Sequence, residues 1–151
     1  QGKFVLVMDS DFAHPPQMIQ TMYEKLANNE FEIVIGSRYI SGGKFDDWPI
    51  HRKFMSRLAS TLPKFLLGLN VNDSNSGFFA IRKDLIKNLS FEAIGEKILL
   101  EILVKTKGVK IKEIPYICKN RKEGSSKFSF SVIDNYFKLL RILLAYNRKF
   151  S

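Results

Sequence analysis

The sequence predicts an α/β fold in which a mostly parallel sheet is flanked by helices. An apolar strand at residues 4–8 is followed by a helical pattern at 18–26 and a second apolar strand at 31–36. This strand–helix–strand order is typical of parallel sheets. Further strand patterns at 78–81 and 109–117 extend the sheet. The apolar content of 45% is ordinary for a globular domain.

The first strand ends in two carboxylates. Its five apolar residues, 4–8, are too few for a helix and suit a strand buried on both faces. Asp9 and Asp11 follow at its carboxyl end, where open α/β sheets place their ligand crevices. Two carboxylates in this position suit one hard divalent cation that is shared with phosphate oxygens. The same pattern also fits a solvated loop or an Asp that caps the next helix.

The next segments are a helix, a strand and a loop. Pro15 and Pro16 suit the first turn of the helix, which we expect to end at Asn28 and Asn29. The strand at 31–36 is followed by a glycine-rich loop that runs to Gly43 and carries Arg38.

A basic amphipathic helix is predicted from Arg52 onward, with a kink or split at Pro63. Such a helix suits a membrane interface, although packing of a surface helix on the core gives the same pattern. The apolar stripe consists of Phe54, Met55, Leu58, Ala59, Leu62, Phe65, Leu66 and Leu69.

The second half of the chain continues with alternating elements. We predict, in order, a turn at 73–77, a strand at 78–81, a helix at 94–107 stopped by Gly108, a strand at 109–117, a basic loop at 119–127 and a basic amphipathic helix from about 131 to 149. The single cysteine, Cys118, excludes a disulfide framework and cysteine-based zinc sites. We expect it to be a small buried residue in a protein of a reducing compartment.

Charge is unevenly distributed. Residues 1–50 carry four basic and seven acidic side chains, whereas residues 51–151 carry 20 basic and eight acidic ones, a net charge of +12. This asymmetry favours a polyanionic partner such as a phosphate-bearing substrate, an anionic membrane or a nucleic acid, although a solvated basic face is the alternative. No apolar run reaches the length of roughly 18 residues that a membrane span requires.

Six motifs occur in a fixed order: Met8-Asp9-Ser10-Asp11 with Pro15-Pro16, Gly36-Ser37-Arg38-Tyr39, Trp48-Pro49 with Arg52, Ser76-Gly77-Phe78-Phe79-Ala80, Ile94-Gly95 with Lys97 and Glu101, and Arg121 with Gly124 and Ser126-Lys127. Together they resemble the dolichol-phosphate mannosyltransferases, which are polyprenyl-phosphate glycosyltransferases of family 2. The resemblance implies a Rossmann-like GT-A fold that here lacks its N-terminal βαβ portion, and we expect an isolated chain without that nucleotide-base pocket to be inactive.

The resemblance also divides the chain, as the C-terminal part of one GT-A domain, into regions. These are a donor and metal region at 1–50, an amphipathic interface segment at 51–72, an acceptor side at 73–124 and a second amphipathic helix at 125–151. The implied activity is inverting, metal-dependent transfer of mannose from GDP-mannose to the phosphate of dolichol or another polyprenol. It implies action at the cytoplasmic face of a membrane and no nucleic-acid partner, and it leaves open a membrane-spanning region or subunit outside this chain.

Site residues follow from the same resemblance. Asp9 and Asp11 would hold Mg²⁺ or Mn²⁺ on the donor diphosphate, although some members have a metal-ligating Gln where this chain has Ala13. The implied catalytic residues are Asp9, Asp11, Arg38 and Arg121. The implied acceptor-phosphate residues are Arg38, Arg52, Ser56, Arg121 and Lys127. The implied membrane-facing residues are Phe54, Leu58, Leu62 and Leu66.

The chemistry is consistent with these residue types. A phosphate acceptor is already an anionic nucleophile near neutral pH, since its second pKa is about 6. It therefore needs cationic positioning rather than a general base, and the planar fork of arginine suits that role. The chain has two histidines, His14 and His51, and we interpret His14 as a loop or capping residue.

Three alternatives stay open at this point. The same chemistry could use UDP-glucose or another sugar nucleotide. A haloacid-dehalogenase-type phosphatase would use Asp9 as nucleophile, but Asp46 and Asp47 come too early to be its second acidic pair. A non-catalytic basic module could bind anionic membrane or nucleic acid, with Phe128, Phe130 and Tyr136 stacking on bases.

Overall fold

The computed structural model describes residues 2–11, 13–46, 48–92, 94, 97–119 and 130–150. In chain order its elements are β1 (Phe4–Val7), α1 (Met18–Ala27), β2 (Ile33–Ser37), β3 (Lys44–Phe45), α2 (Ile50–Leu67), β4 (Phe79–Arg82), α3 (Lys83–Ile86), α4 (Ile98–Lys105), β5 (Ile111–Pro115), β6 (Ile117–Cys118) and α5 (Phe130–Phe150).

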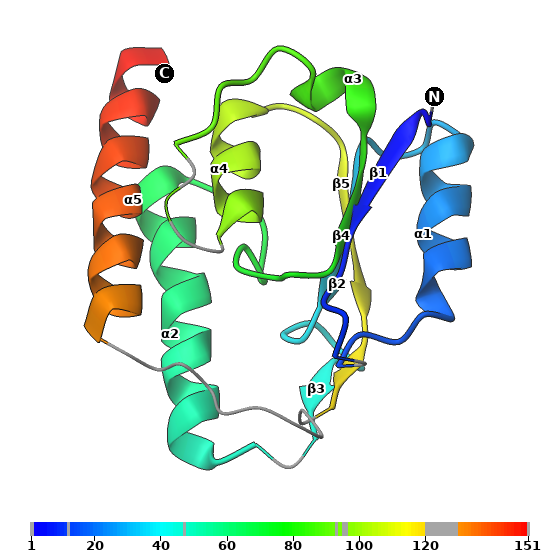
Figure 1. Ribbon diagram of the computed structural model, residues 1–151, viewed down its shortest axis with the longest axis horizontal. Helices are drawn as coiled ribbons and strands as arrows, with labels where there is room; N and C mark the ends of the chain where they lie inside the picture. The colour runs from blue at the N-terminus through cyan, green and yellow to red at the C-terminus, as the bar shows by residue number, and fades with distance from the viewer. Residues whose placement is uncertain are drawn as a thin grey trace.

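The main sheet has the strand order β1-β4-β2-β5 (Figure 1). β2 and β5 are parallel, while β4 lies between β1 and β2 and is antiparallel to both. β1, β2 and β5 therefore run in one direction, which confirms the α/β class, but β4 runs against them. β3 and β6 form a separate two-stranded parallel sheet.

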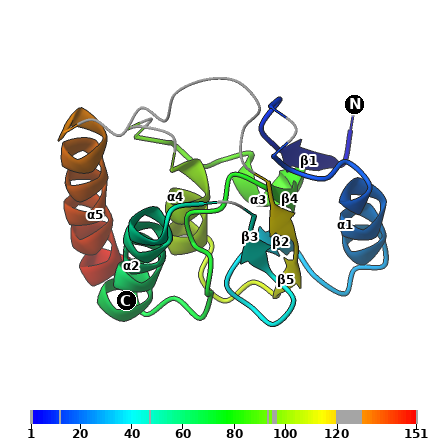
Figure 2. The same cartoon turned by 90° about the horizontal axis from the view of Figure 1, so that it is seen from below.

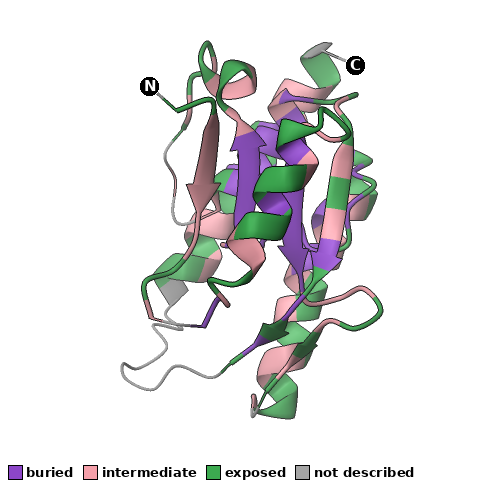
Figure 3. Cartoon of the chain, turned by 90° about the vertical axis from the view of Figure 1, so that its right-hand side faces the viewer, coloured by how far each residue is buried: buried purple, intermediate pink, exposed green. Residues whose placement is uncertain are grey.

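The prediction that residues 4–8 form a strand buried on both faces is wrong for this chain. All four residues of β1 are only partly buried, whereas all five residues of β2 are buried (Figure 3). The reason is topological, because β1 lies at the edge of the described sheet and pairs with β4 alone.

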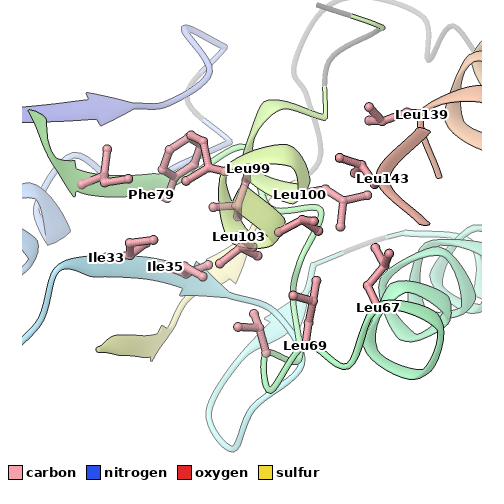
Figure 4. Packing of buried hydrophobic residues seen from close by; sticks show 14 of the residues in the cluster. Ile33, Ile35, Leu67, Leu69, Phe79, Leu99, Leu100, Leu103, Leu139 and Leu143 are labelled. Atoms are coloured by element: carbon pink, nitrogen blue, oxygen red, sulfur yellow. The ribbon is translucent and has the colours of Figure 1, made fainter. Parts of the chain in front are cut away.

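Helices cover both faces of the main sheet (Figure 1). Alternating residues of one strand point to opposite faces, so Ile33 and Ile35 of β2 face one cluster and Val34 faces the other. The smaller cluster contains Met22 and Leu26 of α1. The larger cluster joins the sheet to α4, α2 and α5, and its labelled members in Figure 4 are Ile33, Ile35, Leu67, Leu69, Phe79, Leu99, Leu100, Leu103, Leu139 and Leu143.

Helix α2 continues through Pro63, so the predicted split does not occur. A proline in a helix removes one backbone hydrogen bond to the carbonyl four residues earlier, which here is Ala59. That carbonyl instead accepts hydrogen bonds from Asn75 Nδ2 at 2.8 Å and from Tyr136 Oη at 2.5 Å. These bonds tie the middle of α2 both to α5 and to the segment that precedes β4.

Other sequence predictions agree with the structure in kind and differ in extent. The helix expected at 94–107 is α4, Ile98–Lys105, and the strand expected at 109–117 divides into β5 and β6. The short helix α3 was not predicted. Cys118 is a buried free thiol as expected. In the part of the chain that is described, no helix is both long and apolar enough to cross a membrane.

Candidate active site

β1, β2 and β5 end at the edge of the sheet where β4 begins. The register pairs Val7 and Ile35 with Phe79, and Ser37 with Pro115. Residues just beyond these positions therefore gather at one edge, as predicted for ligand crevices of open sheets. They are Asp9 and Asp11 after β1, Arg38 after β2, residues 73–77 before β4, and Tyr116 after β5.

The two carboxylates after β1 lie in a structured loop. Asp11 Oδ1 accepts a hydrogen bond from the Ala13 N–H at 3.0 Å, which is an Asx-type turn that directs the chain toward α1. The side chain of Asp9 is 47% exposed. Among the described residues no group of three or more His, Cys, Asp and Glu side chains is arranged to hold a metal. Two carboxylates nevertheless fit a hard cation that takes its remaining ligands from phosphate and water.

His14 lies directly behind this loop. It is only 4% exposed, and its Nδ1 accepts a hydrogen bond from the Asp9 N–H at 2.9 Å. Its Nε2 lies 3.8 Å from Asp9 Oδ2. The ring stacks on Phe78 at a centroid distance of 5.0 Å. The interpretation of His14 as a loop residue thus holds, and its Nδ1 accepts a hydrogen bond from the backbone of Asp9.

Arg38 forms a buried ion pair with Asp73. Its Nε and Nη2 each donate to one carboxylate oxygen at 2.7 Å, and its backbone N–H donates to Oδ2 at 3.0 Å. Side-chain exposure is 12% for Arg38 and 0% for Asp73. Burial acts to lower the pKa of Arg38, but the hydrogen bonds and charge of Asp73 outweigh it and hold the pKa above its ordinary value. Arg38 is therefore a fixed cation at the sheet edge.

A cationic and aromatic cluster surrounds the start of α2. Tyr39 Oη donates to Ser56 Oγ at 2.7 Å. The Arg52 guanidinium lies 3.7 Å from the ring centre of Trp48, close enough for a cation–π interaction. Arg38 lies 5.4 Å from the ring centre of Tyr39. The structure thus brings together three of the residues predicted to receive phosphate, which are Arg38, Arg52 and Ser56.

Residues 73–77 connect this cluster to the acidic loop. Asp73 holds Arg38 at one end of the segment. At the other end, a Cβ built on Gly77 would lie 3.5 Å from Asp9 Oδ1, so only a residue without a large side chain fits beside the carboxylate at this position. Between them, Ser76 Oγ donates to the Gly36 carbonyl at 2.7 Å. One short segment therefore holds the candidate phosphate-binding arginine at one end and passes beside the candidate metal loop at the other.

Two predicted site residues, Arg121 and Lys127, lie outside the described residues. The sequence pattern indicates only a turn at Asp73 and does not point to Glu113, whose Oε1 accepts the Asp73 N–H at 3.0 Å. The partners Arg38 and Asp73 are 35 residues apart, so no local spacing rule would have indicated the pair.

Comparisons with known proteins agree with these observations. Residues 1–90 match the family described as Glycosyl transferase family 2. A dolichol-phosphate mannosyltransferase of Pyrococcus furiosus is 39% identical over 91% of this chain, and one of Saccharomyces cerevisiae is 34% identical over 97%. An undecaprenyl-phosphate mannosyltransferase of Micrococcus luteus is 34% identical over 88% of the chain. The chain spans 39%, 57% and 56% of the length of these three relatives, respectively.

A solved structure shares the fold. Glucosyl-3-phosphoglycerate synthase from Mycobacterium tuberculosis, in complex with Mn²⁺, UDP-glucose and phosphoglyceric acid, superposes with a TM-score of 0.66 at 18% identity. The match covers 97% of this chain and 50% of that one. The GT-A-type fold expected from the motifs is thereby confirmed.

Proposed function

Because the chain belongs to glycosyl transferase family 2, we propose that it carries the reaction centre of an enzyme that transfers mannose, with inversion, from GDP-mannose to the phosphate of dolichol or another polyprenol. One observation carries the proposal: the segment 73–77 pairs with Arg38 through Asp73 and passes beside the Asp9 carboxylate at Gly77, where a Cβ would lie 3.5 Å from Asp9 Oδ1. Groups suited to a donor diphosphate and to an acceptor phosphate thus lie at one sheet edge. The named mannosyltransferase relatives support mannose and a polyprenyl acceptor.

On the donor side, Asp9 and Asp11 would hold Mg²⁺ or Mn²⁺. When bound, the cation neutralises negative charge on the departing diphosphate. The Mn²⁺ and UDP-glucose complex of the M. tuberculosis synthase supports a divalent cation for this fold. In this chain the carboxylates supply the hard oxygen ligands that both metals prefer.

On the acceptor side, Arg38, Arg52 and Ser56 would receive the lipid phosphate, joined by Arg121 and Lys127. The phosphate is the nucleophile and is already anionic, so these side chains orient it and reduce its repulsion from the donor diphosphate. The fixed bidentate fork of Arg38 on Asp73 leaves the guanidinium in one orientation. A preorganised cation loses little entropy when it binds phosphate.

Transfer from labelled donors tests the proposal. GDP-mannose and UDP-glucose are offered separately, with polyprenyl phosphate in vesicles and Mn²⁺, to the full-length protein. We expect mannose in the lipid fraction, lost on chelation and reduced by about 10²-fold or more in Asp9→Asn. Asp84→Asn is the matched control, because Asp84 is an exposed carboxylate in α3.

Each outcome of that assay has a definite meaning. Glucose transfer in place of mannose transfer would leave the proposed mechanism unchanged and would identify UDP-glucose as the donor. Transfer that survives Asp9→Asn or chelation would overturn the metal site. No transfer from either donor to polyprenyl phosphate by the full-length protein would overturn the proposed function.

We also propose that α2 and α5 contact the membrane that contains the lipid. Exposure is 67% for Phe54, 49% for Leu58 and 44% for Leu66, and Phe65 is 80% exposed. Leu62 packs against the main core, so it does not belong to this surface. α5 lies beside α2 (Figure 2) and adds Val132, Phe137 and Ile142.

Liposome sedimentation tests this surface. The double variant Phe54→Glu and Leu58→Glu is expected to reduce binding to anionic vesicles at least several-fold, since apolar insertion is lost while basic flanks worth about 1 kcal/mol each are kept. Tyr23→Glu is the control, because Tyr23 is 52% exposed on α1 on the other face of the sheet. If the Tyr23→Glu control lost as much vesicle binding as the double variant, this would contradict the assignment of α2 to the membrane surface.

A further inference from the structure

His14 is a buried polar residue that the proposed reaction does not use. Its Nδ1 accepts the Asp9 backbone N–H at 2.9 Å, and its Nε2 lies 3.8 Å from Asp9 Oδ2. In a ring whose Nδ1 accepts a hydrogen bond, the hydrogen of the neutral form is on Nε2. The nitrogen that carries this hydrogen is therefore the one 3.8 Å from the carboxylate. One side chain thus contacts both the backbone and the side chain of the candidate metal ligand.

The orientation of the His14 ring is fixed by its neighbours. It stacks on Phe78 with an angle of 9° between the rings and meets Tyr116 edge-on at 5.5 Å. Phe78 has little freedom to move, because it is fully buried and its ring packs closely on Gly36. A Cβ added to Gly36 would lie only 2.6 Å from Phe78 Cδ1. The packing therefore extends from β2 through Phe78 to His14.

Gly77 completes the surroundings of the pair. A Cβ at this position would lie 3.6 Å from His14 Cε1 and 3.5 Å from Asp9 Oδ1. The imidazole edge and the carboxylate thus both lie near Gly77, two residues before β4. Asp9 is held on one side by the buried His14, although its own side chain is 47% exposed.

We propose that His14 is a positioning residue whose Nδ1 fixes the Asp9 backbone, and so directs the Asp9 carboxylate toward the donor-bound cation. This inference rests on the proposed function, because that function gives Asp9 its cation. It adds a distinct claim: the acceptor nitrogen of His14, rather than its ring volume, sets how well the loop binds metal.

Two variants separate these roles. The Oδ1 atom of Asn lies close to the position of Nδ1, so His14→Asn keeps an acceptor for the Asp9 N–H. His14→Gln places its amide near the position of Nε2 and loses that acceptor. Both variants lose the ring that stacks on Phe78, so a purely structural role predicts equal effects. His51→Asn, at an exposed position in α2, is the control.

The experiment measures hydrogen exchange of the Asp9 amide by NMR, and Mn²⁺ binding by electron paramagnetic resonance with Mn²⁺ alone as the probe. We expect His14→Gln to accelerate Asp9 exchange and to weaken Mn²⁺ binding, each by roughly 3- to 10-fold, while His14→Asn stays within about 2-fold of the parent. Equal changes in Asn and Gln variants would overturn the role of Nδ1.

The two readouts also separate this inference from the proposed function. Amide exchange needs no metal, donor or lipid, so it decides the backbone role of His14 even if no sugar is transferred. A parent protein that binds no Mn²⁺ overturns the metal site and, with it, the claim that His14 serves that site. If the Asp9 amide of His14→Gln stays protected from exchange and this variant binds Mn²⁺ as well as the parent, the inference is also overturned.

Discussion

Replacing Asp73 by alanine is expected to lower the free energy of unfolding by about 3–5 kcal/mol, because it leaves the Arg38 guanidinium buried without its anion. The carboxylate is fully buried, and it accepts three hydrogen bonds from Arg38 at 2.7–3.0 Å. Ser60 Oγ of α2 lies 3.4 Å from the same carboxylate, so the loss also loosens α2. Urea denaturation measures this loss, and we expect the dependence of the unfolding free energy on urea concentration to stay unchanged.

Two comparisons make this prediction specific. Asp84→Ala removes an ion pair with Arg82 in which the side chains of Asp84 and Arg82 are 64% and 33% exposed, and its effect on stability should be far smaller, because water already screens an exposed pair. Replacing both Arg38 and Asp73 by apolar residues of similar volume should cost less than Asp73→Ala alone, since no buried charge is left unpaired. A double variant as unstable as the sum of the two single variants would show that the pair itself is not the cause.

Replacing Glu101 by alanine should have an effect of similar size, about 3–5 kcal/mol. Glu101 and Lys105, one turn apart on α4, form an ion pair at 2.6 Å with side chains only 3% and 5% exposed. Glu101 also accepts the Glu92 N–H at 2.8 Å, and Lys105 donates to the Ser90 carbonyl at 2.6 Å. The pair therefore fixes the chain before α4 as well as the helix, and both attachments are lost together.

The chain contains a matched control for this second prediction. Asp134 and Lys138 of α5 have the same spacing and the same 2.6 Å distance, but their side chains are about 60% exposed. Asp134→Ala should cost only about 0.3–0.5 kcal/mol. Thermal or urea denaturation of Glu101→Ala and Asp134→Ala compares the stability lost from a buried and from an exposed ion pair of the same spacing and distance. Equal losses would contradict the claim that desolvation of Lys105 makes its partner essential.

Local pattern was sufficient to predict much of the fold. The five apolar residues before Asp9, the helical spacing from Met18 to Leu26 and the glycine after α4 each reflect short-range physics, namely side-chain period and backbone conformation. These rules place the acidic loop at the end of β1 and Arg38 at the end of β2. The ordered motifs then indicated the family, which the match to residues 1–90 confirms.

Position within the sheet was not predictable in the same way. Strand β4 inserts between β1 and β2 and runs against both, and the sequence of a strand does not state which neighbour it pairs with. The edge position of β1 is likewise a property of the sheet order. The partners of the carbonyl freed by Pro63 were not predictable either, since Asn75 and Tyr136 come from distant segments.

The sequence by itself therefore determined the class of fold, the family and the residue types of the candidate site, because each is encoded in short motifs and periodicity. Only the tertiary structure showed which other side chains bind and position those site residues. Arg38 and Asp73 are 35 positions apart, and His14 reaches Asp9 through a ring whose orientation depends on Phe78. Ion pairs and buried hydrogen bonds depend on distance in space, and folding brings together groups that no local pattern connects.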